Sequence, residues 1–131
     1  MTTHEIYPDT PEDVYDKYYA EDKRKSEILF LEREIEIAEK RLKKADALLR
    51  LESNPDWVVV MQDGYMDEFA KNAIRGLGRG NIKKEELHEV LEGIGSLQTH
   101  LEGLLQLANT AKMELPRMRD ELVSLKTVVM N

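Results

Sequence analysis

The fold is decided by residues 87–129, which read LHEVLEGIGSLQTHLEGLLQLANTAKMELPRMRDELVSLKTVV. Apolar residues recur in this stretch at alternating spacings of three and four, the heptad pattern of a helix that packs along one face. The thirteen positions are Leu87, Val90, Ile94, Leu97, Leu101, Leu104, Ala108, Ala111, Leu115, Met118, Leu122, Leu125 and Val129. We expect a long helix from residue 82, either kinked at Pro116 or split into 82–115 and 116–129, because proline removes a backbone hydrogen bond.

A second heptad precedes the first and predicts a long helix over 26–53. Its members are Ile28, Leu31, Ile35, Ala38, Leu42, Ala45 and Leu49. Charged residues crowd the other faces, as on a solvated helix surface. The two heptads pack against each other either within one chain or between subunits, and the pattern leaves both alternatives open.

The segment between the two heptads predicts short helices and a turn. Asn54 followed by Pro55 is a helix-start signal, so short helices are expected over 55–75, interrupted at Asp63-Gly64. Three glycines in Gly76-Leu-Gly-Arg-Gly80 predict a loop over 76–81 that reverses the chain, with Asn81 capping the next helix. The predicted fold class is all-α: a long helical hairpin or coiled-coil-like bundle with an extended or short-helical N-terminal arm.

The N-terminal arm, residues 1–25, differs in composition from the helical domain predicted over 26–131. Residues 1–30 hold 8 acids and 4 bases. Pro11 marks the start of a short helix over about 11–24. Four of the five tyrosines lie in the arm, and tyrosine is favoured at interfaces. We therefore expect this arm to bind a partner through Tyr7, Tyr15, Tyr18 and Tyr19.

The segment after Leu115 is a second predicted partner-binding region. If the two long helices already cover each other, this segment has no intramolecular partner of matching length. Its stripe of Met118, Leu122, Leu125 and Val129 is then expected to be exposed and to bind another chain.

Composition excludes several function classes. A length of 131 residues is that of one domain, and a net charge of −7 argues against general nucleic-acid binding. The chain has no cysteine, and no apolar run is long enough for a membrane span. Residues 71–84 are a basic exception with five bases and no acid, so an anion or nucleic-acid contact is expected only there, at Arg75, Arg79, Lys83 and Lys84.

No catalytic, metal or cofactor site is predicted. Glu85 and His88 have the Glu-x-x-His spacing of di-iron bundles, but the second copy that such a site needs is missing. We expect a protein that is not an enzyme. Gly93, Gly95 and Gly103 interrupt the strongest helix pattern, which indicates either close packing, with Trp57 or Tyr65 over Gly93 or Gly95, or a hinge.

Three motifs carry a resemblance to a known family. Asn54-Pro55-Asp56-Trp57, Asp63-Gly64-Tyr65 and Ile94-Gly95-x-Leu97 resemble a family of small helical proteins of tailed bacteriophages, over about residues 30–112. The resemblance implies a structural or assembly role, in the virion or the host cytoplasm, with virion proteins, assembly proteins or further copies of this chain as partners. The alternatives are a DNA-engaging, oligomeric packaging subunit that uses the basic segment, and a small regulator that binds a host protein.

Overall fold

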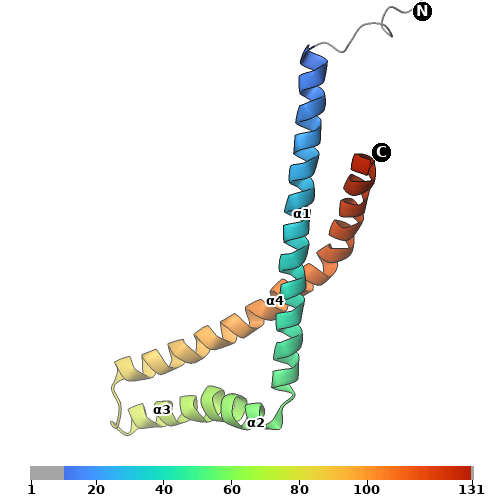
Figure 1. The fold of residues 1–131 in the computed structure, drawn as a ribbon. Helices are drawn as coiled ribbons and strands as arrows, with labels where there is room; N and C mark the ends of the chain where they lie inside the picture. Colours follow the sequence, from blue (N-terminus) through green and yellow to red (C-terminus); the bar gives the residue numbers. More distant parts are fainter. Residues whose placement is uncertain (1–10, 131) are drawn as a thin grey trace, which may run out of the picture. The chain divides into compact units, whose positions relative to one another are not determined.

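The computed structural model describes residues 11–130, apart from the side chains of Asp13, Val128, Val129 and Met130. Throughout this range the regular elements are helices, and no strand occurs among them, so the predicted all-α class is confirmed (Figure 1). The elements in chain order are α1 (Pro11–Glu52), α2 (Pro55–Trp57), the π-helix η2 (Val58–Glu68), α3 (Phe69–Gly78) and α4 (Lys84–Met130).

Helix α1 joins two elements that were expected to be separate. It runs for 42 residues from Pro11, so the expected short helix over 11–24 and the long helix over 26–53 are one helix. Residues 20–25, Ala-Glu-Asp-Lys-Arg-Lys, contain no glycine or proline and mostly favour a helix, so nothing local ends the helix there. The end of α1 at Glu52 agrees with the predicted end at residue 53. The predicted helix start after it is also present, since the Asn54 side chain accepts a hydrogen bond of 2.8 Å from the Asp56 N–H and caps α2.

The expected interruption at Asp63-Gly64 is wrong, because η2 carries the helix through this position. The Phe69 N–H donates to the Gly64 carbonyl, five residues back, as in a π-helix. Gly64 suits this wider turn, since a Cβ there would lie 3.1 Å from the Val59 carbonyl oxygen. The glycine therefore permits a close backbone approach within a helix and does not end one.

The turn between α3 and α4 is shorter than the expected loop over 76–81. Gly80 has a φ of 74°, and the N–H groups of Gly80 and Asn81 donate to the carbonyls of Leu77 and Gly76 at 3.1 and 2.8 Å. This is a Schellman motif, which closes the carbonyl end of α3. Asn81 thus ends the preceding helix and does not cap the next one, which begins at Lys84.

Helix α4 is continuous for 47 residues and contains Pro116. Of the two predicted alternatives, a split helix is wrong. Proline removes only one backbone donor, and Leu115 and Met118 on either side of it are buried, so packing holds the helix together. Every described member of the α4 heptad is buried or half-buried, which confirms the predicted packing face.

The chain forms two compact units, each with its own apolar core. The first comprises Met1–Ala38 and Met113–Asn131, and the second comprises Glu39–Lys112. In the first unit the part of α1 up to Ala38 packs against the C-terminal part of α4, with Leu31, Ala38, Leu115 and Met118 buried. An ion pair of 3.2 Å between Lys126 Nζ and Glu32 Oε1 joins the same two segments. The segment after Leu115 therefore has an intramolecular partner.

In the second unit the end of α1, the short helices and the first part of α4 share a core. Its buried members are Ala45, Leu48, Ile94, Ala108 and Ala111. Leu48 replaces the predicted Leu49, which is 52% exposed. Leu48 lies on the same side of α1 as Glu52, one turn later, and Glu52 lines a pocket together with Trp57 and Leu101. This side of α1 therefore faces the short helices and α4. The buried face of α1 therefore follows the short helices and α4, and departs from a strict heptad.

Candidate interaction surfaces

The first half of α1 exposes a cluster of large apolar side chains, which we call the outer α1 face. The exposed fractions are 68% for Tyr15, 64% for Tyr18, 62% for Tyr19, 65% for Leu29 and 62% for Phe30. At about 100° of rotation per residue, these positions centre on the side opposite to Ile28, Leu31, Ile35 and Ala38. One stretch of helix thus has an apolar side in the core and a second, mainly aromatic side exposed.

Two of the tyrosines of the outer α1 face contact each other. The rings of Tyr15 and Tyr19, one helical turn apart, stack with centroids 6.4 Å apart and planes inclined by 16°. Such a pair presents a rigid surface with two hydroxyl groups that can bind a partner's polar groups. The structure therefore places the predicted Tyr15, Tyr18 and Tyr19 together, whereas Tyr7 lies outside the described residues.

Leu29 and Phe30 belong to the same face and were missed in the sequence analysis. They follow Tyr18 and Tyr19 by eleven residues, which is close to three full turns of an α-helix. That spacing is present in the sequence. The common face was missed because a new helix was expected to start near residue 26, and positions on separate helices have no common face.

The predicted C-terminal stripe is not an exposed surface. Met118 is buried, and Leu122 and Leu125 are half-buried in the first unit. The expectation of exposure is wrong because the long helix predicted over 26–53 is shared: its part up to Ala38 packs against the C-terminal part of α4, as the Lys126–Glu32 ion pair shows, and only its later part packs with the first part of α4. The side chain of Val129 lies outside the described residues.

The basic residues predicted for anion contact lie at the turn between α3 and α4. Arg75, Arg79, Lys83 and Lys84 are all exposed. Lys71, from the same basic segment, pairs with Asp67 at 3.0 Å. The turn thus presents four exposed bases, although the Schellman motif uses the backbone N–H groups of Gly80 and Asn81 within the protein.

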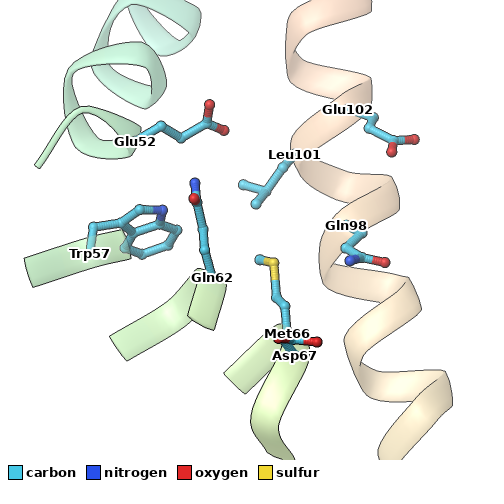
Figure 2. Close-up of a pocket in the computed structure, with 8 residues that line it drawn as sticks. All are labelled: Glu52, Trp57, Gln62, Met66, Asp67, Gln98, Leu101 and Glu102. Carbon is cyan, nitrogen blue, oxygen red and sulfur yellow. The ribbon is translucent and has the colours of Figure 1, made fainter. Parts of the chain in front are cut away.

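A pocket of about 410 Å³ lies within the second unit, between the end of α1, the short helices and α4 (Figure 2). Three carboxylates, two amides, one indole and two aliphatic side chains line it: Glu52, Asp67, Glu102, Gln62, Gln98, Trp57, Met66 and Leu101. The buried Trp57 Nε1–H has no hydrogen-bond acceptor. Among these eight residues there is no basic side chain and no serine, cysteine or histidine, so the ionisable groups of the pocket are its three carboxylates.

The histidine motif leads to no metal centre. His88 Nε2 lies 3.7 Å from Glu92 Oε2, one turn away, and both side chains are more than two-thirds exposed. Within residues 11–130, no three His, Cys, Asp or Glu side chains come together as metal ligands do. The described helices also include none with the length and apolar character that crossing a bilayer requires.

No family model, curated protein or solved structure matches the chain. The resemblance to small helical phage proteins therefore stays an expectation.

Proposed function

We propose that this protein is a non-enzymatic structural or assembly component of a tailed phage particle, which binds its partners through the outer α1 face. The observation that carries the proposal is the exposure of five large apolar side chains on one side of a helix whose other side is already in a core. Exposed large apolar side chains gathered on one helix face are typical of interaction sites.

The energetics favour such a role. Burial of a large apolar side chain contributes roughly 1.5–3 kcal/mol, so a few residues of this face are enough to hold a subunit in an assembly. Repeated copies in a particle add avidity to each contact. The phage setting itself comes from the sequence resemblance and is part of the proposal.

The proposal is tested by incorporation of the protein into purified phage particles. We expect Tyr15→Ala combined with Tyr18→Ala to reduce incorporation by about tenfold or more, since two central contacts are lost. The matched control combines Met113→Ala with Val123→Ala, which removes two apolar side chains that are 81% and 64% exposed on α4. Unchanged incorporation of the tyrosine variant would contradict the proposal. Complete absence of the unaltered chain from particles would favour the host-protein regulator.

The DNA-engaging alternative depends on the four exposed bases at the α3–α4 turn. It predicts binding that weakens steeply between about 50 and 200 mM salt, and that is lost when Arg79 and Lys83 are replaced by Glu. Salt-independent or absent binding would remove this alternative and leave the outer α1 face as the functional surface.

A further inference from the structure

The outer α1 face contains a second, shorter heptad. Tyr15, Tyr18, Asp22, Lys25 and Leu29 are spaced by three, four, three and four residues, and all five are exposed. This is the spacing of the seam of a two-stranded coiled coil. The seam is apolar at both ends and has one acid and one base at its centre. This central pair of opposite charges identifies the partner of the seam.

The two central charges favour one orientation of a helix paired with a copy of itself. In a parallel pair, Asp22 would face Asp22 and Lys25 would face Lys25 of the second copy. In an antiparallel pair centred between residues 23 and 24, Asp22 instead faces Lys25, and Tyr18 faces Leu29. Polar residues in a coiled-coil seam commonly set orientation in this way, because like charges repel and opposite charges attract.

We infer that the outer α1 face binds a second copy of this chain as an antiparallel helix pair, with Asp22 of each copy against Lys25 of the other. Charges beside the seam agree, since the exposed Glu12 of one copy comes near the exposed Arg33 of the other. This inference rests on the proposed function, because it names the partner of the same face.

Charge exchange tests the pairing. We expect the full chain to form a dimer in sedimentation equilibrium. Asp22→Lys alone and Lys25→Asp alone should each weaken the dimer by about tenfold or more, since each places like charges in the seam twice. The double variant Asp22→Lys with Lys25→Asp should restore dimerisation, and an equimolar mixture of the two single variants should form the heterodimer. Asp46→Lys, an exposed site on α1 in the second unit, is the control and should have no effect.

Orientation is measured separately with a spin label. The chain has no cysteine, so Glu12→Cys gives one labelling site per copy. In the antiparallel pair, residue 12 lies opposite residue 35 of the partner, which separates the two labelled positions by about 35 Å at about 1.5 Å per residue. A parallel pair would bring the labels to about 10 Å, the distance between packed helices.

Several results would overturn the inference: a monomeric full chain, a dimer indifferent to both single variants, a mixture that fails to form the heterodimer, or a short label distance. Its failure is distinguishable from failure of the proposed function. A monomer whose tyrosine variant is still lost from particles would overturn self-pairing alone. A charge-dependent dimer whose tyrosine variant is incorporated normally would support self-pairing and contradict the role in the particle.

Discussion

The Tyr65 hydroxyl lies directly over Gly93, so that a Cβ atom at Gly93 would be 3.4 Å from the hydroxyl oxygen. This contact joins η2 to α4 within the second unit, and a side chain at position 93 that extends beyond Cβ towards Tyr65 would have to displace the hydroxyl. The prediction of close packing by Tyr65 is confirmed at this position. No side chain packs in this way over Gly95 or Gly103, where a Cβ would meet nothing within 4 Å, and nothing in the structure explains these two glycines.

Larger side chains at Gly93 should separate η2 from α4. We expect Gly93→Leu to lower the free energy of unfolding by about 1–3 kcal/mol, as overpacking does. Gly95→Ala and Gly103→Ala are the matched controls, and each should raise it by up to about 1 kcal/mol because alanine favours a helix. Urea unfolding followed by circular dichroism measures all three, and a stable Gly93→Leu variant would contradict the packing role of Tyr65.

Gly80 is expected to be the most sensitive glycine of the α3–α4 turn. Its φ of 74° is unfavourable for any residue with a Cβ, so Gly80→Ala should cost about 1–2 kcal/mol of stability. Gly78→Ala, two residues earlier and inside α3, meets no atom within 4 Å and should be neutral or stabilising. Equal effects of the two substitutions in thermal unfolding would argue against the Schellman motif.

The cap at Asn54 should stabilise the start of the short helices. Asn54→Ala removes the acceptor for the Asp56 N–H and should lower the free energy of unfolding by about 0.5–2 kcal/mol. Asn54→Asp keeps an acceptor oxygen at the same position and should lose little. If both variants unfold at the same urea concentration as the unaltered chain, the side chain does not act as a cap.

Met118 distinguishes a core position from a surface that awaits another protein. Because Met118 is buried, Met118→Ala should lower the free energy of unfolding by about 2–5 kcal/mol. Lys126→Ala breaks the ion pair with Glu32. Because the side chains of Lys126 and Glu32 are 51% and 44% exposed, this substitution should lower the free energy of unfolding by less than about 1 kcal/mol. A Met118→Ala variant as stable as the unaltered chain would revive the expectation that this side chain binds a partner.

The sequence by itself determined the helices and most of their buried faces. Heptads such as Leu31 to Ala38 and Ile94 to Met118 predict which residues are buried, because helical periodicity is a local property of the chain. The pair Asn54-Pro55 likewise predicted the start of α2, since capping involves only neighbouring residues. The exposed tyrosines of the candidate surface were identified in the same way, from their spacing and their distance from any predicted core.

Only the tertiary structure decided which partner each helix face meets. The heptad pattern of Met118, Leu122 and Leu125 is the same whether the stripe contacts another chain or α1. The outcome was determined by the division of α1 between the two units, which leaves its part up to Ala38 for the C-terminal part of α4. Leu48 is buried in place of Leu49 because the side of α1 that carries Leu48 and Glu52 faces the short helices and the first part of α4. Helix α4 continues through Pro116 because the residues beside the proline are packed. In each case burial depends on residues far apart in the sequence, and local periodicity contains no information about them.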